Sequence, residues 1–231
     1  MTRLLVSVRS VTEAALAVQG GADFIDLKEP NEGALGGLPI ATIAAVVEAL
    51  RTQGVMLPIS ATIGDLPMGA LDRVMRRVEA VGACGVTYVK VGIERVPEAE
   101  AAAVLAALAG SSRAVVPVFI ADRGLDDTLV AQACGLGFPA LMVDTADKAA
   151  GSVFDVMAVE ALQRFITQAR AAGALAGIAG ALRLVHLPQM RALAPDFAGF
   201  RSAVCAQDRR GDLDLARLRG LVAAMRGDAR R

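Results

Sequence analysis

The lysines of this chain are few, and their positions indicate chemistry rather than surface charge. Of the 24 basic residues only three are lysines, namely Lys28, Lys90 and Lys148, and the rest are arginines. Each lysine ends a short apolar run or follows one within a few residues. Arginine supplies positive charge equally well, but it cannot form an imine or release a proton near neutral pH. We therefore predict that these three amines react at the ends of three buried strands.

Two aspartates lie close to these lysines in the sequence. Asp26 precedes Lys28 by two residues, so the two side chains share one face of an extended strand and lie roughly 7 Å apart. Asp144 ends the apolar run 140–144 and precedes Lys148 by four residues. A carboxylate or an amine is costly to bury without a partner. We expect Asp26 and Asp144 to keep neighbouring ammonium groups charged and to transfer protons.

Clustered amines indicate imine chemistry. An amine attacks a carbonyl only when it is neutral, and about one unperturbed lysine side chain in 2,000 is neutral at pH 7. A second ammonium within ~4–6 Å, together with partial burial, favours the neutral form. The constellation therefore predicts a reaction of the class I aldolase type on a carbonyl substrate; its members are Asp26, Lys28, Lys90, Asp144 and Lys148. The alternative is that the lysines form structural ion pairs that close the top of the fold.

Eight short apolar runs position these residues, and segments with helical spacing alternate with them, for example 152–172 and 182–193. The expected strands cover residues 4–8, 24–28, 58–62, 86–91, 114–120, 140–144, 175–179 and 199–204. Such continuous apolar runs are typical of parallel strands buried on both faces. The alternation predicts a single (β/α)8 TIM barrel over residues 1–231, with a short Arg-rich tail at about 227–231.

A doubly wound sheet is the alternative architecture. That fold needs a glycine-rich phosphate turn after its first strand, and residues 9–11, Arg-Ser-Val, do not supply one. In a barrel, the active site lies at the carboxyl ends of the strands, and alternate strands contribute side chains to one level. The second, fourth and sixth expected strands end in Asp26 with Lys28, in Lys90 and in Asp144. We therefore expect these groups to converge, with Lys148 just beyond.

Phosphate groups in barrels are often bound by the loops after the seventh and eighth strands. Here those loops contain Gly180, which allows close approach of the backbone, and Arg201 with Ser202, which offer a guanidinium fork and a hydroxyl. We predict a phosphate site at these three residues; a glycine turn beside a structural arginine is the alternative. The glycine-containing loop 29–38 is either a mobile lid or a long turn, and His186 is assigned no role.

Composition argues against several classes of protein. The formal net charge is zero, which disfavours a nucleic-acid binder held by phosphate neutralisation. No apolar run reaches the ~18–20 residues of a membrane helix, and the first residues do not resemble a signal peptide, so we expect a cytoplasmic location. Three separated cysteines and one histidine give no metal-binding spacing. We expect no cofactor and a small phosphorylated carbonyl substrate as partner, and we leave a homo-oligomer open.

Several motifs resemble those of one known family. They are Gly20-Gly21-Ala22-Asp23-Phe24-Ile25-Asp26-Leu27-Lys28-Glu29-Pro30, then Glu32-Gly33-Ala34-Leu35-Gly36, the strand Tyr88-Val89-Lys90-Val91-Gly92, Asp144-Thr145 followed by Lys148 and Gly151, and Gly199-Phe200-Arg201-Ser202-Ala203-Val204-Cys205. Over essentially its whole length the chain resembles the (5-formylfuran-3-yl)methyl phosphate synthase family of methanofuran biosynthesis.

The resemblance implies a (β/α)8 lyase that condenses two molecules of glyceraldehyde 3-phosphate into a phosphorylated furan aldehyde, with loss of phosphate and water. It implies that Lys28 forms the Schiff base and that the other four charged residues act as acids, bases or charge-stabilising groups. It also implies a place in one-carbon metabolism, in the synthesis of methanofuran or an analogue. Two rivals remain: another class I aldolase-like or phosphate-substrate decarboxylase barrel, and a non-catalytic metabolite-binding barrel.

Overall fold

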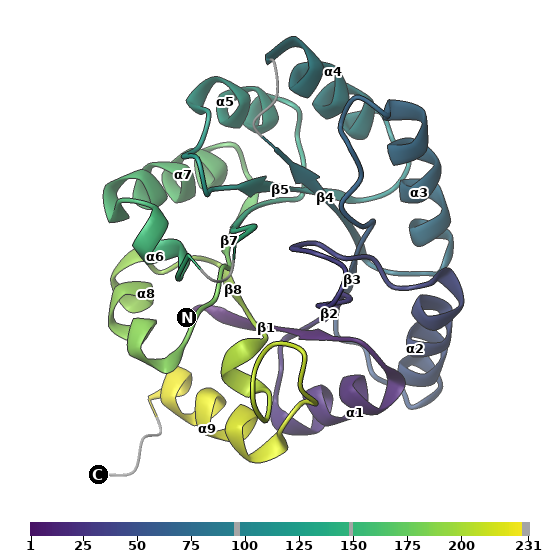
Figure 1. Cartoon of the computed structure of the whole chain (residues 1–231), viewed down its shortest axis with the longest axis vertical. Coiled ribbons are helices and arrows are strands. Elements are labelled where there is room, and N and C mark those ends of the chain that lie inside the picture. Colours follow the sequence, from purple (N-terminus) through teal and green to yellow (C-terminus); the bar gives the residue numbers. More distant parts are fainter. Residues whose placement is uncertain (95–97, 148–149, 228–231) are drawn as a thin grey trace.

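The apolar runs of the sequence form eight parallel strands that close into a barrel (Figure 1). A computed structural model describes residues 1–94, 98–147 and 150–227. Each strand pairs with the next one along the chain, and the eighth pairs with the first. The strands are β1 (Arg3–Val8), β2 (Phe24–Leu27), β3 (Ile59–Thr62), β4 (Tyr88–Ile93), β5 (Val115–Ile120), β6 (Ala140–Asp144), β7 (Leu175–Ile178) and β8 (Phe197–Phe200). The (β/α)8 TIM barrel predicted from the sequence is confirmed.

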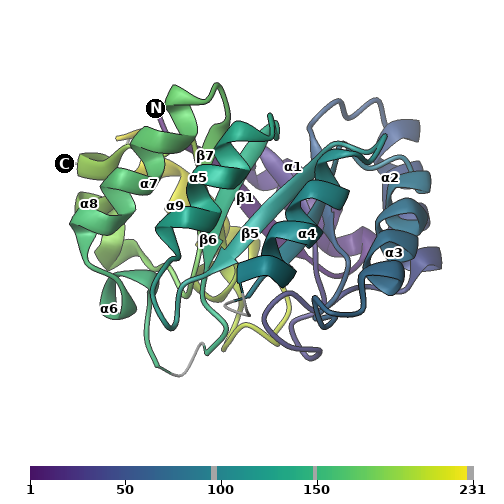
Figure 2. The same ribbon diagram turned by 90° about the horizontal axis from the view of Figure 1, so that it is seen from above.

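Helices surround the sheet (Figure 1). They are α1 (Val11–Gly20), α2 (Ile40–Thr52), α3 (Leu71–Ala83), α4 (Glu98–Ala109), α5 (Asp127–Gly135), α6 (Val153–Val156), α7 (Val159–Ala171), α8 (Leu187–Leu193) and α9 (Leu215–Arg226), with 3-10 turns η1 (Leu184–His186) and η2 (Ser202–Val204). Figure 2 shows the longer loops at the end of the barrel opposite the N-terminus. Within the described ranges, no helix has the length and apolar character needed to cross a membrane.

The start of α1 shows how local sequence positions a side chain for the site. The Ser10 hydroxyl accepts a hydrogen bond from the N–H of Glu13 at 3.2 Å, and the Glu13 carboxylate accepts one from the N–H of Arg9 at 2.9 Å. The first bond is the serine half of a capping box; the Glu13 carboxylate caps the N–H of Arg9, one residue before the N-cap, instead of that of Ser10. Together these bonds fix Glu13 at the carboxyl end of β1, where its side chain is buried.

Several strand ends differ by one or two residues from the sequence prediction, and three segments differ in kind. The strand expected at 199–204 is displaced, because Arg201 leaves extended geometry (φ −134°, ψ −63°) and η2 follows it. The helix expected at 152–172 is split into α6 and α7, since Met157 between them is extended (φ −130°, ψ 140°). The segment 182–193 contains η1 before α8. Residues 228–231 of the expected tail lie outside the described residues.

The barrel interior is filled mainly by aliphatic side chains and two phenylalanines. Phe24 and Phe197 lie with ring centroids 5.7 Å apart, and the Arg3 guanidinium lies over the Phe24 ring at 4.8 Å. Gly177 on β7 leaves room for this arrangement, because a Cβ there would lie 2.2 Å from the Phe197 ring. The barrel therefore accommodates its few aromatic side chains by placing glycine beside one of them.

We expect Gly177→Ala to lower the free energy of unfolding by about 1–3 kcal/mol, because the added methyl overpacks a rigid, buried ring. Gly135→Ala, at the end of α5, is the matched control, since a methyl group added there would have no atom within 4 Å. That control should be neutral or slightly stabilising. Urea unfolding of both variants measures the difference. Equal stability of the two variants would show that Phe197 moves aside without cost.

Candidate active site

Three strands bring the predicted charged residues to one pocket at the carboxyl end of the barrel. Asp26 lies on β2, Lys90 on β4 and Asp144 at the end of β6, while Lys28 directly follows β2. These four residues line one pocket. Lys148, the fifth residue predicted for the site, lies outside the described residues. The four predicted residues that the structure describes therefore lie together in one pocket, as expected from the sequence.

Asp26 is the most enclosed carboxylate of the pocket. It accepts hydrogen bonds from Ser7 Oγ at 3.0 Å, from Ser60 Oγ at 2.6 Å and from Lys90 Nζ at 2.9 Å. Burial alone would raise the pKa of Asp26, but the ammonium groups of Lys90 and Lys28 and the hydrogen bonds together hold that pKa below its usual value. Asp26 is therefore an anion at neutral pH, and the ammonium form of Lys90 is its counterion.

Ser7 and Ser60 were not singled out from the sequence. They face Asp26 because the strand register pairs Ser7 on β1 and Ser60 on β3 with the same aspartate. The available signal was a serine in each of two mainly apolar runs. That signal becomes specific only when the register between neighbouring strands is known.

Lys28 forms a second ion pair on the pocket wall. Its Nζ donates to Asp144 Oδ2 at 3.1 Å, and the N–H of Thr145 donates to the other oxygen of Asp144 at 2.8 Å. The Lys28 side chain is 10% exposed, whereas that of Lys90 is 3% exposed. Lys28 is thus the amine of these two that a substrate entering the pocket reaches more easily, and it has a carboxylate beside it to receive a proton.

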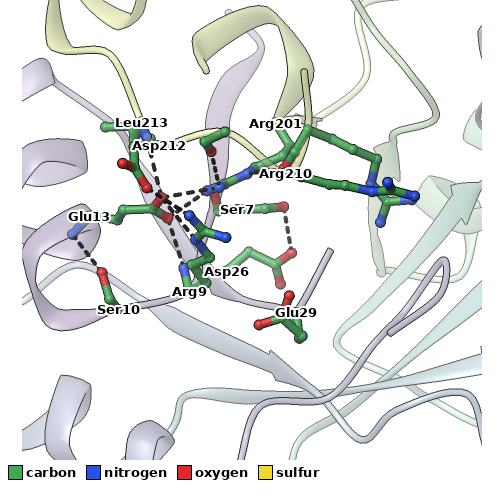
Figure 3. A network of polar contacts seen from close by, with 12 residues as sticks. Ser7, Arg9, Ser10, Glu13, Asp26, Glu29, Arg201, Arg210, Asp212 and Leu213 are labelled. Carbon is green, nitrogen blue, oxygen red and sulfur yellow. Dashed lines mark hydrogen bonds and ion pairs between the residues drawn. The ribbon is translucent and has the colours of Figure 1, made fainter. Parts of the chain in front are cut away.

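Arg201 is bound on every side by the protein, as Figure 3 shows. Its Nη1 and Nη2 donate to the two carboxylate oxygens of Glu13 at 2.5 and 3.1 Å. Nη1 also donates to the Ser7 carbonyl, Nη2 to the Gly211 carbonyl and Nε to the Arg209 carbonyl. A guanidinium has five N–H groups, and all five are used. This geometry favours a structural role for Arg201 over the predicted contact with phosphate.

Gly180 and Ser202, the other predicted phosphate-binding residues, both line the pocket. Gly180 has a φ of 110°, and a Cβ there would lie 2.9 Å from the Thr145 side chain, so the position requires glycine. The neighbouring N–H groups of Ala181 and Leu182 donate to no backbone acceptor within the described residues. Two loops of this rim therefore have backbone and hydroxyl donors available, and binding of a phosphate by Gly180 and Ser202 stays a prediction.

The loop 29–38 is anchored over the pocket. The Gly36 carbonyl accepts from the Glu29 N–H at 2.9 Å and from Thr62 Oγ1 at 2.8 Å, and a Cβ on Gly36 would lie 2.2 Å from the Glu29 carbonyl oxygen. The Leu35 side chain is buried. Arg209, from the loop after β8, donates from Nη2 to the Gly33 carbonyl at 2.8 Å. The loop is thus a compact turn with contacts on both sides.

Metal binding finds no support in the side chains that the structure describes, because no group of three or more histidine, cysteine, aspartate and glutamate residues there has suitable geometry. The cysteines are spread over the fold, and burial raises the pKa of the Cys205 thiol to about 11. The titratable groups that line the pocket are amines, guanidinium groups and carboxylates. Groups of these types can form imines, move protons and stabilise negative charge.

Relatives of known name cover nearly the whole chain. A family model described as 4-HFC-P synthase matches residues 4–222. A (5-formylfuran-3-yl)methyl phosphate synthase from Archaeoglobus fulgidus is 36% identical over 222 residues, covering 90% of this chain and 92% of the relative. One from Methanopyrus kandleri is 35% identical and covers 94% of both chains. A Methylorubrum extorquens protein provisionally given the same name is 37% identical, covering 99% of this chain and 93% of the relative.

Solved structures resemble the fold at lower sequence identity. Phosphoribosyl anthranilate isomerase from Thermus thermophilus superposes with a TM-score of 0.67 at 18% identity, covering 98% of this chain and 99% of that chain. A 3-hexulose-6-phosphate synthase superposes with a TM-score of 0.58 at 18% identity, covering 95% and 99%. At such identities the likeness supports the barrel fold and nothing further.

Proposed function

Because the chain belongs to the (5-formylfuran-3-yl)methyl phosphate synthase family, we propose that it makes this phosphorylated furan aldehyde from two molecules of glyceraldehyde 3-phosphate. The proposal includes Lys28 as the amine that forms a Schiff base with one triose. One observation carries it: Lys28 Nζ lies 3.1 Å from Asp144 on the wall of a pocket that also holds the Lys90–Asp26 pair.

The proposed reaction balances without an external oxidant or reductant. Two triose phosphates contain all the carbon of the product, and the conversion releases one inorganic phosphate and two water molecules. Forming the furan thus requires an addition between two carbonyl compounds followed by eliminations. Each of these steps needs proton transfers and an electron sink, and a protonated imine is such a sink. This class of reaction, a carbon–oxygen lyase, suits a site built from amines and carboxylates.

The geometry supports a division of roles between the two ion pairs. In this proposal Asp144, 3.1 Å from Lys28 Nζ, accepts the proton that Lys28 must lose before its Nζ attacks the aldehyde carbon. In the same proposal Lys90, which pairs with Asp26 at 2.9 Å, donates a proton to a hydroxyl or phosphate group as that group leaves. A role for Lys148 as a further acid or base rests on the family resemblance alone. The same resemblance supports a place in the synthesis of methanofuran or an analogue.

The product decides between this proposal and its closest rival. Incubation with glyceraldehyde 3-phosphate alone should produce a near-ultraviolet chromophore and one inorganic phosphate per molecule of chromophore. A phosphate-specific assay and mass spectrometry of the product measure both. Consumption of the triose with no phosphate release would instead favour a sugar-phosphate aldolase, and no consumption at all would favour a non-catalytic barrel.

A further inference from the structure

The cations that line the pocket are not all paired. Among the described lining residues there are four, namely Lys28, Lys90, Arg201 and Arg209. The first three each form an ion pair, with Asp144, Asp26 and Glu13 in that order. Arg209 forms no ion pair with any residue that the structure describes. The pocket wall therefore ends, on the side of the β8–α9 loop, in a guanidinium without a protein anion.

Arg209 also has unused hydrogen-bond donors. Its single side-chain hydrogen bond within the described part of the chain runs from Nη2 to the Gly33 carbonyl, which leaves four of the five N–H groups of a guanidinium available. Arg201, only eight residues away, differs in this respect, because all of its N–H donors are used in hydrogen bonds to the protein. Of the two arginines at this rim, Arg209 is the one that can present a fork to a ligand.

The surroundings of Arg209 favour an anionic ligand. The residue is half-buried, and burial lowers the pKa of its guanidinium; Arg210 and Arg201 act in the same direction, whereas the more distant carboxylates of Asp144 and Asp65 oppose them without forming an ion pair with Arg209. A partly desolvated cation near two other cations is costly unless an anion compensates it. The described residues supply no such anion in contact with Arg209, so we expect a bound ligand to supply it.

The loop that carries Arg209 is built to hold it in place. Cys205 and Leu213, at the two ends of the loop, form an isolated antiparallel β-bridge. The Ala206 N–H donates to the Asp212 carbonyl at 3.0 Å. Arg201 Nε donates to the carbonyl of Arg209 itself at 2.8 Å. The Glu13–Arg201 pair therefore fixes the backbone from which the Arg209 side chain extends over the pocket.

We propose that Arg209 binds the phosphate group of the triose that reacts at Lys28, and that Arg201 positions Arg209 rather than contacting the phosphate itself. This inference rests on the proposed function and extends it to one group of the substrate. A phosphate monoester dianion matches the fork of a guanidinium in geometry and opposes it in charge. Gly180 and Ser202, from the loops after β7 and β8, line the same pocket as Arg209.

Binding of inorganic phosphate tests the assignment directly and does not depend on imine formation. Calorimetric titration of the intact protein with inorganic phosphate should show binding that Arg209→Ala weakens by about 10- to 100-fold, the usual effect of losing a charge-assisted fork. Arg209→Lys should lose part of the affinity, because it keeps the charge but not the fork. Arg210→Ala is the matched control: it removes the exposed neighbour in the same loop and should change affinity less than about threefold.

Aldehyde trapping separates this inference from the proposed function. The concentration of glyceraldehyde 3-phosphate that half-saturates borohydride trapping should rise about 10- to 100-fold in Arg209→Ala, while trapping of glyceraldehyde, which lacks the phosphate, should stay unchanged. Equal loss for both aldehydes, or phosphate binding that Arg209→Ala does not weaken, would overturn the assignment. A wild-type protein that binds phosphate through Arg209 but makes no furan would instead overturn the proposed function and leave the phosphate site standing.

The positioning role of Arg201 has its own test. Arg201→Lys should weaken phosphate binding in the wild-type background but cause no further loss in the Arg209→Ala background, because Arg201 acts through Arg209. Urea unfolding of each variant checks that the barrel remains folded. Additive losses from the two substitutions would mean that Arg201 contacts the phosphate independently, and the assignment of the two arginines would then be wrong.

Discussion

Replacing Lys28 with arginine is expected to abolish product formation, by at least about a thousandfold, and to remove the borohydride-trapped adduct. Arginine keeps a positive charge beside Asp144 but cannot form an imine under these conditions. The ion pair that now holds Lys28 can therefore persist while the nucleophile is lost. The experiment is digestion and mass spectrometry after reduction in the presence of glyceraldehyde 3-phosphate, together with the rate of chromophore formation.

A control variant separates the nucleophile from its surroundings. Lys90→Arg retains a cation next to Asp26, so the adduct on Lys28 should still form in this variant although later proton transfers slow down. If reduction instead labels Lys90 in the wild-type protein, the roles of the two amines are exchanged. If the substrate is consumed and no lysine is labelled, the amines act only through their charge, and a decarboxylase-like barrel becomes the better interpretation.

Replacing Asp26 with asparagine is expected to have the second largest effect, because it removes the anion that compensates a buried ammonium. Leaving one member of a buried ion pair without its partner typically costs about 3–5 kcal/mol of unfolding free energy. Turnover should also fall by about 10²–10⁴-fold, since Lys90 loses the group that orients it for proton transfer. Ser60→Ala, which deletes one hydrogen bond to Asp26 and leaves its charge, should cost only about 1 kcal/mol.

The effect of Asp26 on stability should depend on pH in a defined direction. Its pKa in the folded protein is lowered, so it stabilises the fold above the pKa of the unfolded chain, about 3.9. That contribution is lost as the pH falls through the lower folded-state pKa. The difference in unfolding free energy between wild type and Asp26→Asn should be constant near neutral pH and shrink below about pH 4. A difference that grows on acidification would contradict the lowered pKa.

The sequence predicted those parts of the site that depend on residue type and strand position. Lysine is rare in this arginine-rich chain, and this rarity drew attention to Lys28 and Lys90. Asp26 and Asp144 lie near the carboxyl ends of even-numbered strands, so they were expected to lie beside these lysines. The partners of these residues could not be predicted. Ser7 and Ser60 meet Asp26 through strand register, which depends on packing over the whole barrel.

Arg201 and Arg209 show why the other parts of the site could not be predicted from the sequence. Arg201 lies in a loop position where barrels often bind phosphate, so the sequence analysis selected it; Arg209, in a loop with other charged residues, was not considered there. The guanidinium donors of Arg201 are used by protein acceptors, and one of these is Glu13, which lies 188 positions away in the sequence. The end of β8 was likewise not predicted: the strand stops at Phe200, and the backbone leaves extended geometry at Arg201, the residue that contacts Glu13.

The same long-range contact determines when the site is complete during synthesis. Lys28, Lys90 and Asp144 lie in the first two thirds of the chain, but the pair between Glu13 and Arg201 joins the first helix to the segment after the last strand. A chain still emerging from the ribosome therefore carries its reactive amines before it can hold the Arg209 loop in place. If Arg209 binds the triose phosphate as proposed, retention of that substrate begins only when the carboxyl-terminal segment has docked and the barrel has closed.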